Sequence, residues 1–344
     1  MQFDNPHHTF VIAEAGSNWK VGSFEDDLIQ AKKLIDVAKN AGANAVKFQT
    51  YKAETVFVPN AGRIEYLLEK GIDQSINDIF QHLSMPYEMI PELSDYCKKN
   101  GIMFMSTPFS IADAKAVDPY VEIHKIASFE INHIRLLEYL AKCRKPILVS
   151  TGASTYDEID FAVNLLKKNN NENIGLLQCT SKYPAPIESL NLGVIPQMKL
   201  RYNLPIGFSD HSMDPLIAPL CAIGFGATFI EKHFTLDRNL PGPDHPFALI
   251  PQELELMINA IRKADKAKGS GEKVILNVEQ ELRQVGKRAI QAIKEIKKGD
   301  ILHEGINFDV LRPGKRTRGL EPRFLSKVEG GKAKKDFALG EGIT

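Results

Sequence analysis

Short apolar runs rich in β-branched residues alternate with longer amphipathic segments along most of the chain, up to about residue 265. This alternation predicts repeated strand–helix units and a parallel sheet. Eight runs have the length and composition of buried strands, and they span residues 9–15, 45–50, 102–107, 122–127, 146–151, 174–180, 205–210 and 228–234.

The segments between these runs have the period of an α-helix. In residues 23–42, the apolar side chains Leu28, Leu34, Ile35 and Ala38 fall on one helical face, and Gly42 provides a stop. Eight such units within about 265 residues match the size of a (β/α)8 TIM barrel, although a doubly wound sheet would have the same local pattern. We predict an α/β barrel over residues 1–268.

The character of the sequence changes beyond the predicted barrel. Residues 269–286 are polar and punctuated by glycine, with one helical piece, which indicates a linker. Residues 287–344 contain only short β-like pieces and turns, which predicts a small β-rich domain. A domain of this size is marginally stable alone, so we expect it to pack on the barrel or on another subunit.

Composition excludes several classes of partner. Lys plus Arg and Asp plus Glu both number 43, and the sequence has no basic stripe of the kind that nucleic acid binding needs. The N-terminal apolar run is short for a signal peptide, and no segment approaches the ~20 apolar residues of a membrane span. The four cysteines follow no metal-site or disulfide spacing. We therefore expect a cytoplasmic protein with no nucleic acid or membrane partner.

Two histidines follow the last two predicted strands. His211 and His233 would be neighbours in a barrel, where catalytic groups sit at the C-terminal ends of the strands. A single histidine at a strand end is more often a structural hydrogen-bonding residue. As a pair they could bind one cation together with carboxylates and water, a site that suits Mn²⁺ or a similar divalent ion better than structural zinc.

Cationic and hydroxyl side chains end several other strands. Lys47 and Lys125 could be salt-bridged barrel residues, or they could bind a small phosphorylated or carboxylated anion with nearby hydroxyl groups. Those hydroxyl groups belong to Thr107, Ser128, Ser181 and Ser209. The sequence has neither GxGxxG nor GxxxxGK[ST], so a nucleotide is not indicated.

Two carboxylates complete the candidate chemistry. Glu14 follows the apolar run FVIA, and it either pairs with a lysine or acts as a general base beside the anion. Asp244 lies in the rigid turn PGPDH, where it either caps the turn or meets a polyhydroxyl substrate at the mouth of the barrel.

Motifs along nearly the whole chain resemble those of the sialic acid synthases. They are FVIAEAGSN, GANAVKFQTYKAE, MSTPFS, HKIASFEI, PILVSTG, CTSKYPAP, GFSDHS, IEKHFTLDRNLPGPDH, KKGDIL and LRPG, in the order of that family. These enzymes condense phosphoenolpyruvate with an N-acylated hexosamine to form nine-carbon 2-keto acids.

The resemblance implies a role for each candidate residue. It implies metal binding by His211 and His233, with Mn²⁺ or another divalent ion such as Mg²⁺ or Co²⁺, and it makes Glu14 a catalytic carboxylate. The implied phosphoenolpyruvate contacts are Lys47, Thr107, Lys125, Ser128 and Ser209, with Ser181 where some members have Asn. The implied sugar contacts are Gln49, Phe109, Glu130, Tyr183 and Asp244.

The resemblance also implies a quaternary arrangement. The C-terminal domain would resemble type III antifreeze proteins, as a SAF domain, in a domain-swapped homodimer. Arg312 in LRPG would enter the active site of the partner subunit. The chain ends at GEGIT, where family members usually continue, so the last turn of this domain is expected to be short.

Several functions remain open at this level. The acceptor could be N-acetylmannosamine or 2,4-diacetamido-2,4,6-trideoxymannose, which would give N-acetylneuraminate or legionaminate, and the motif LPGPDH favours these over pseudaminate. Another phosphoenolpyruvate-dependent 3-deoxy-ulosonate synthase is disfavoured, because the acceptor end lacks a second basic cluster for a phosphosugar. A non-catalytic sugar-binding protein of polysaccharide assembly would keep the same fold.

Overall fold

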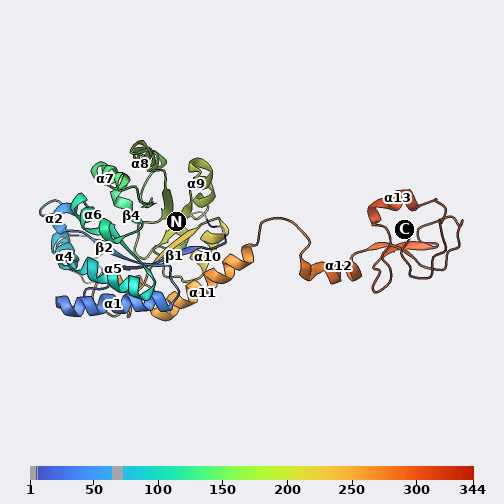
Figure 1. The fold of residues 1–344 in the computed structure, drawn as a ribbon, viewed down its shortest axis with the longest axis horizontal. Helices are drawn as coiled ribbons and strands as arrows, with labels where there is room; N and C mark the ends of the chain where they lie inside the picture. The colour runs from blue at the N-terminus through green and yellow to red at the C-terminus, as the bar shows by residue number, and fades with distance from the viewer. Residues whose placement is uncertain (1–4, 6, 64–72) are drawn as a thin grey trace. The chain divides into compact units, whose positions relative to one another are not determined.

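The computed structural model describes residues 5, 7–63 and 73–344 (Figure 1). The chain divides into two compact units, Met1–Gly269 and Ser270–Thr344. The predicted boundary at residue 268 and the predicted linker over 269–286 fall in the region where the first unit ends.

The first unit is a (β/α)8 barrel, as the sequence predicts. All neighbouring strands in the order β3-β2-β1-β8-β7-β6-β5-β4 are parallel. The two strands at the ends of this order, β3 and β4, lie next to each other and close the ring. The strands are β1 (Phe10–Gly16), β2 (Ala45–Thr50), β3 (Met103–Pro108), β4 (His124–Ile126), β5 (Ile147–Ser150), β6 (Ile174–Cys179), β7 (Ile206–Asp210) and β8 (Phe229–His233).

Helices surround this ring (Figure 1). Helix α1 begins after Ser23, whose hydroxyl accepts a hydrogen bond from the Asp26 backbone in a capping box, and it buries Leu34, Ile35 and Ala38 as its apolar face predicts. The helices of the first unit are α1 (Phe24–Asn40), α2 (Ala53–Val56), α4 (Ile76–Leu83), α5 (Met89–Asn100), α6 (Ile111–Val117), α7 (Ile134–Lys142), α8 (Tyr156–Lys168), α9 (Val194–Tyr202), α10 (Ile217–Gly224) and α11 (Pro251–Lys268), with short 3-10 turns η1 (Asp118–Tyr120), η2 (Ser128–Glu130), η3 (Ile187–Ser189) and η4 (His245–Phe247).

The interior of the barrel is a packed apolar core below the strand ends. Two glycines make room for Phe229 in this core: a Cβ at Gly207 would lie 2.6 Å from the Phe229 Cβ, and one at Gly175 would lie 3.3 Å from its ring. The buried residues of this interior cluster are Ile12, Ala45, Met105, Ile123, Leu148, Leu177 and Phe229. Because these side chains fill the lower part of the barrel, polar side chains can gather only above them.

The second unit is small and mostly irregular. It contains η5 (Asn277–Glu279), α12 (Gln280–Gly286), the antiparallel pair β9 (Ala289–Ala292) and β10 (Phe308–Leu311), η6 (Pro322–Phe324) and α13 (Leu325–Val328). Its own core includes Ile290, Phe308, Phe337 and Ile343. The sequence predicts the small β-containing unit, and residues 277–286 form helical turns where one helical piece is expected within the linker.

Two features bear on the expected environment of the protein. Among the helices of the described residues, none is both long enough and apolar enough to cross a bilayer. All four cysteines are free.

Candidate active site

One cavity opens at the C-terminal ends of the barrel strands. It has a volume of about 390 Å³. All but two of the predicted site residues line it: Glu14, Lys47, Gln49, Thr107, Phe109, Lys125, Ser128, Ser181, Tyr183, Ser209, His211, His233 and Asp244. The strands thus bring together side chains that are up to 230 residues apart, from Glu14 to Asp244.

Two lysines and two carboxylates form a charged cluster at the base of this cavity. Lys47 Nζ lies 2.6 Å from Glu14 Oε2 and 3.7 Å from Glu231 Oε2, and Lys125 Nζ lies 3.9 Å from Glu231 Oε1. None of the four side chains is more than 6% exposed. Because these charged groups are shielded from water, each of them depends on its neighbours for stabilisation.

Burial and these neighbours shift the pKa of each group. Burial raises the pKa of Glu14 to about 7. Burial would also raise the pKa of Glu231, but the positive charges of Lys125 and Lys47 outweigh burial and lower this pKa. Burial lowers the pKa of Lys125, whereas the two carboxylates outweigh burial at Lys47 and raise its pKa. Glu14 is therefore the carboxyl group of the cluster that can exchange a proton near neutral pH.

Hydroxyl groups extend the cluster into a surface suited to an anion. Lys47 Nζ donates a hydrogen bond to Thr107 Oγ1 at 3.0 Å, and Lys125 Nζ donates one to Ser150 Oγ at 2.7 Å. Ser209 Oγ donates to Glu231 Oε1 at 3.0 Å. These contacts hold both ammonium groups in place at the cavity floor.

A glycine keeps a small polar recess open beside Lys125. The Gly152 backbone N–H donates to Ser128 Oγ at 3.0 Å. A Cβ at this position would lie 2.3 Å from Ser181 Oγ and 2.9 Å from Ser128 Oγ. Among the described residues, buried Ser181 Oγ has no hydrogen-bond partner. A recess that holds an unpaired hydroxyl, in a cavity that two lysines also line, fits an anionic oxygen.

The two predicted metal histidines face each other across one side of the cavity. Their ring centroids are 5.5 Å apart. His211 Nδ1 lies 2.8 Å from the Thr180 carbonyl, which only accepts, so Nδ1 carries the hydrogen and Nε2 keeps its lone pair. His233 Nδ1 is buried and lacks a hydrogen-bond partner within the described part of the chain. Burial and neighbouring cations hold the pKa of His233 well below its ordinary value, which keeps the ring neutral.

Two imidazoles with accessible lone pairs fit a divalent cation. At His211 a proton competes with the cation. Burial alone would lower the pKa of His211, but the neighbouring Cys179, whose Sγ lies 3.7 Å from Nδ1, outweighs burial and raises this pKa. A cation bound at Nε2 would replace that proton.

A different group of potential metal ligands lies at the N-terminal end of β4. Side-chain atoms of Asp118, His124 and Cys143 lie within 4.8 Å of one another. Lys145 Nζ lies 3.0 Å from the same Asp118 Oδ1 that contacts His124 Nε2, so the carboxylate already has a cationic partner. This group is separate from the cavity, which opens at the other end of the strands.

Residues expected to contact a sugar surround the histidines. Asp244 Oδ2 lies 3.8 Å from His233 Nδ1 and accepts a hydrogen bond from Ser17 Oγ at 3.3 Å. Gln49 Nε2 donates to Glu14 Oε1 at 3.0 Å. The Tyr183 ring lies 4.2 Å from the His211 ring. Asp244 can approach this closely because Gly16, with a φ of +52°, has no Cβ; one would lie 2.7 Å from Asp244 Oδ2.

Two predicted site residues lie outside the cavity. Glu130 is at the end of the 3-10 turn η2; burial raises its pKa to about 7, and its Oε2 has no hydrogen-bond partner among described residues. Arg312 follows β10 in the second unit and is exposed. Neither residue contributes to the cavity within one barrel.

The sequence-based list also lacks residues that the structure places at the site. The sequence places Glu231 on the same strand face as His233 by period two, but it was assigned no role in the site. Ser150 and Cys179 end β5 and β6 and also line the cavity. Gly152 carries no chemical group, so only the close approach of its neighbours reveals its role.

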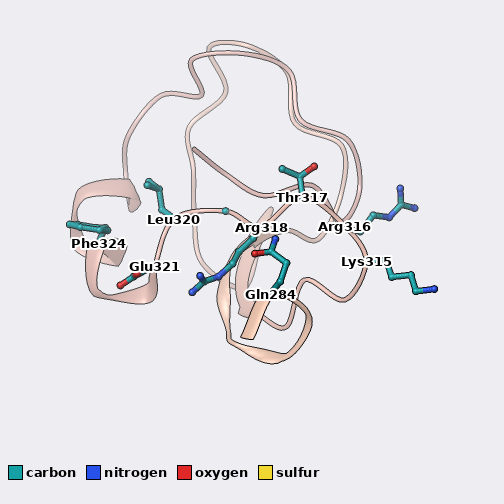
Figure 2. A pocket seen from close by; sticks show the side chains of 9 residues that line it. Gln284, Lys315, Arg316, Thr317, Arg318, Leu320, Glu321 and Phe324 are labelled. Carbon is teal, nitrogen blue, oxygen red and sulfur yellow. The ribbon is translucent and has the colours of Figure 1, made fainter. Parts of the chain in front are cut away.

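The second unit has a basic pocket of its own (Figure 2). Gln284, Lys315, Arg316, Arg318 and Glu321 are among its lining residues, and Figure 2 shows the Lys315 and Arg316 side chains extending outward. Arg318 Nε and Nη2 are buried and make no hydrogen bond to the described residues. The sequence did not predict this pocket.

Comparison with known proteins gives matches over nearly the whole chain. A model described as the NeuB family matches residues 34–273. The spore coat polysaccharide biosynthesis protein SpsE of Bacillus subtilis is 39% identical over 352 residues, which cover 97% of this chain and 92% of that protein. The crystal structure of SpsE has a TM-score of 0.65 to this chain and covers 98% of it and 94% of the SpsE chain.

Several relatives carry the names of enzymes, and two of them serve as examples. The N,N'-diacetyllegionaminic acid synthase of Campylobacter jejuni is 38% identical and covers 97% of this chain and 99% of its own. A pseudaminic acid synthase of Campylobacter jejuni (strain 81-176) is 35% identical and covers 99% of this chain and 97% of its own.

Proposed function

This chain belongs to the NeuB family, and we propose that it condenses phosphoenolpyruvate with an N-acetylated hexosamine and water. The products would be a nine-carbon 2-keto-3-deoxy acid and phosphate. Membership of this family makes the chain a C–C bond-forming transferase that uses phosphoenolpyruvate. The observation that carries the proposal is the single cavity in which the buried Lys47 and Lys125 lie beside His211 and His233.

Lys47, Lys125 and the hydroxyl recess would bind phosphoenolpyruvate. Its phosphate and carboxylate groups need cations and donors in a site that excludes water, and Lys47, Lys125, Ser128 and Ser181 offer them. Thr107 and Ser209 orient the cluster through their bonds to Lys47 and Glu231. Phosphoenolpyruvate would therefore lie at the base of the cavity.

His211 and His233 would hold a divalent cation, Mn²⁺ or another ion such as Mg²⁺ or Co²⁺. When bound, this ion supplies Lewis-acid polarisation of the sugar aldehyde. The chain itself contributes two neutral imidazole nitrogens, with Thr180 fixing the tautomer of His211.

The reaction would proceed by attack of C3 of phosphoenolpyruvate on the aldehyde carbon, which forms the new C–C bond and opens the C=O π bond to an alkoxide. Water adds at C2, which has become cationic, and gives its proton to Glu14. The proton that the added water loses through Glu14 would neutralise this alkoxide. The resulting tetrahedral intermediate collapses with C–O cleavage and releases phosphate. Lys47 and Lys125 stabilise the negative charge of the phosphate throughout.

The acceptor would contact Gln49, Tyr183 and Asp244 near the histidines, with Phe109 farther out. We propose N-acetylmannosamine or 2,4-diacetamido-2,4,6-trideoxymannose as the acceptor, giving N-acetylneuraminate or legionaminate. Pseudaminate is the alternative product, because relatives of similar identity are named for legionaminic and for pseudaminic acid.

The second unit would act on the partner subunit of a domain-swapped homodimer, as an antifreeze-like SAF domain. Arg312, exposed and cationic at the end of β10, is the residue proposed to close the partner's site. We also propose that the enzyme works in the cytoplasm, where phosphoenolpyruvate is made.

The experiment that tests this function is a product assay. Purified protein would be mixed with phosphoenolpyruvate, Mn²⁺ and each amino sugar in turn, and phosphate release would be measured together with the 2-keto acid by mass spectrometry. We expect a product with one of the sugars, abolished by EDTA and restored by Mn²⁺. Tight binding of a sugar by folded protein without any product would favour the non-catalytic alternative.

A further inference from the structure

Four aromatic side chains form a continuous wall on one side of the cavity. This aromatic wall consists of Tyr51, Phe57, Phe80 and Phe109, all of which line the cavity. Tyr51 follows β2, Phe57 follows α2, Phe80 lies in α4 and Phe109 follows β3. The wall therefore belongs to the side of the barrel mouth formed by β2 and β3.

The rings pack in tilted and edge-to-face pairs and support one another. The Tyr51 ring lies 5.0 Å from the Phe80 ring and 5.2 Å from the Phe109 ring, and Phe57 lies 4.6 Å from Phe80. Tyr51 is 3% exposed, and it anchors the wall together with the buried Ile79 and Leu83. Such contacts hold the rings in fixed positions rather than as mobile surface side chains.

The wall begins next to the groups proposed to hold the reacting end of the sugar. Asp244 lies 3.8 Å from His233 Nδ1. It also influences Tyr51, because burial is the main cause that raises the pKa of Tyr51 and the charge of Asp244 is the second. A sugar whose aldehyde lies at the histidines and whose hydroxyls meet Asp244 would extend its far end along Tyr51 toward Phe80 and Phe57.

The far end of such a sugar is where the acceptors considered for this chain differ in chemistry. At C6 they carry a methyl group, a hydroxyl or a phosphate, and at C4 a hydroxyl or an acetamido group. A hydroxyl or phosphate pressed against aromatic rings loses water without gaining a partner, whereas methyl groups gain apolar contact.

Two of the lysines that line the cavity are held at its base by carboxylates. Among the described lining residues, the cations are Lys47, Lys125 and Lys182. The first two pair with carboxylates at the base of the cavity, and Lys182 follows β6 next to Tyr183, on the side of the histidines.

We propose that the aromatic wall is the specificity subsite for the distal end of the acceptor, and that it selects a 6-deoxy hexose acylated at the C2 and C4 amino groups. This inference rests on the proposed function and names the substrate class within it. The C6 methyl group and the C4 acetyl methyl would contact Phe57 and Phe80. N-acetylmannosamine, with hydroxyls at both positions, and its 6-phosphate would be poorer acceptors.

The test compares acceptors that differ at these carbons. With Mn²⁺ and saturating phosphoenolpyruvate, kcat/KM would be measured for the manno and altro forms of 2,4-diacetamido-2,4,6-trideoxyhexose, for N-acetylmannosamine, for its 6-deoxy derivative and for its 6-phosphate. We expect at least one diacetamido-6-deoxy sugar to exceed N-acetylmannosamine by about 10- to 100-fold. The 6-deoxy derivative should fall between them, and the 6-phosphate should be the poorest.

Variants of the wall connect this preference to particular rings. Phe80→Ser and, as a second variant should that one fold poorly, Phe57→Ser should each reduce the preference for the deoxy sugars to a few-fold. Phe225→Ser removes an aromatic ring that is 43% exposed and outside the cavity, so it should keep the preference of the unaltered enzyme.

The outcomes separate this inference from the function on which it rests. Product formed equally well or better from N-acetylmannosamine or its 6-phosphate would overturn the inference and leave the synthase function standing. A preference that survives unchanged in folded Phe80→Ser and Phe57→Ser would remove the wall as its cause. No 2-keto acid from any sugar would instead contradict the proposed function itself.

Discussion

Glu14 combines near-complete burial with a direct contact to a cation. Its carboxylate lies 2.6 Å from Lys47, yet burial still raises its pKa to about 7. A carboxyl group with this pKa can take a proton from water and return it at neutral pH, which is the property required of a general base.

Turnover is therefore expected to depend on the protonation of Glu14. Below about pH 7 the carboxyl group holds its proton and cannot accept one from water, so kcat should fall as the pH falls through this value. Glu14→Gln should lower kcat by about 100-fold or more and abolish this acid limb. The measurement is kcat against pH under saturating substrates and metal.

Glu130 provides a matched control for that experiment. Burial also raises its pKa to about 7, but its side chain does not line the cavity. Glu130→Gln should keep the acid limb of the pH profile. If Glu130→Gln lost the limb and Glu14→Gln kept it, the general base would be Glu130.

Glu130, which the resemblance places near the sugar, shows why the sequence alone does not give the direction of every side chain. Strand ends follow period two, so alternate residues such as Lys47 and Gln49, or Glu231 and His233, share a face and reach the cavity together. Ser128 and Glu130 have the same spacing, but they lie in the 3-10 turn η2, where residues two apart point in different directions. The sequence does not reveal that the backbone changes period at this point.

At the scale of elements, a buried ion pair joins the ends of the two strands that carry the histidines. Lys232 and Asp210 precede His233 and His211, and their side chains point away from the cavity. Lys232 Nζ lies 2.6 Å from Asp210 Oδ2, with exposed fractions of 1% and 0%, and it also donates to the Asp214 carbonyl at 3.0 Å. Asp210 Oδ1 accepts from the Ser212 backbone at 2.8 Å. This pair fixes the loop that positions His211.

Breaking the pair should affect both stability and metal binding. Lys232→Met leaves Asp210 buried without its cation, so we expect the free energy of unfolding to fall by about 3–5 kcal/mol. Because the loop that carries His211 loosens, Mn²⁺ affinity should weaken by about 10- to 100-fold. Urea denaturation and electron paramagnetic resonance of free Mn²⁺ measure these two effects.

The double variant Asp210→Asn/Lys232→Met removes the unpaired buried charge of Asp210. It should therefore recover part of the stability that Lys232→Met loses. Lys20→Met is a control, because the Lys20–Asp27 pair has the same 2.6 Å separation but Lys20 is 17% exposed. Its loss of stability should be smaller, and Mn²⁺ affinity should stay near that of the unaltered protein. Unchanged Mn²⁺ affinity in folded Lys232→Met would show that the pair does not position His211.

The barrel core offers a second prediction at this scale. A Cβ at Gly207 would lie 2.6 Å from the Phe229 Cβ and 2.9 Å from its carbonyl oxygen, and the backbone cannot move aside cheaply. Gly207→Ala should therefore destabilise the protein by about 1–3 kcal/mol. Gly193→Ala, where a Cβ would meet nothing within 4 Å, is the control in the same denaturation experiment. Equal stability of the two variants would contradict this packing argument.

The elements themselves were predictable to the extent that local pattern determines them. The eight strands begin and end within about two residues of the expected positions, because buried parallel strands are continuous apolar runs. The second unit was predictable only as small and β-containing. Its backbone pairings, such as Ile296 with Phe337 and Ile301 with Lys332, join residues more than 30 positions apart, and tertiary packing rather than local pattern determines them.

At the scale of the whole molecule, the barrel holds the proposed substrate cavity while the residue proposed to close it is in the other unit. Arg312 belongs to Ser270–Thr344, whereas the cavity belongs to Met1–Gly269. If Arg312 acts on the partner subunit, dimer formation is part of catalysis, since a closed site needs groups from two chains. Arg312→Ala should lower kcat sharply while gel filtration still shows a dimer.

A heterodimer separates action on the partner from action within one chain. One subunit would carry His233→Asn, which disables its barrel, and the other Arg312→Ala, and two different affinity tags would isolate the mixed dimer. If the arginine acts on the partner, the intact barrel receives the intact Arg312, and the heterodimer should have about half the activity of the unaltered dimer. If Arg312 acts within its own chain, neither site is complete and the heterodimer should be as inactive as the two parent variants. Full activity in the Arg312→Ala homodimer would remove this arginine from the site altogether.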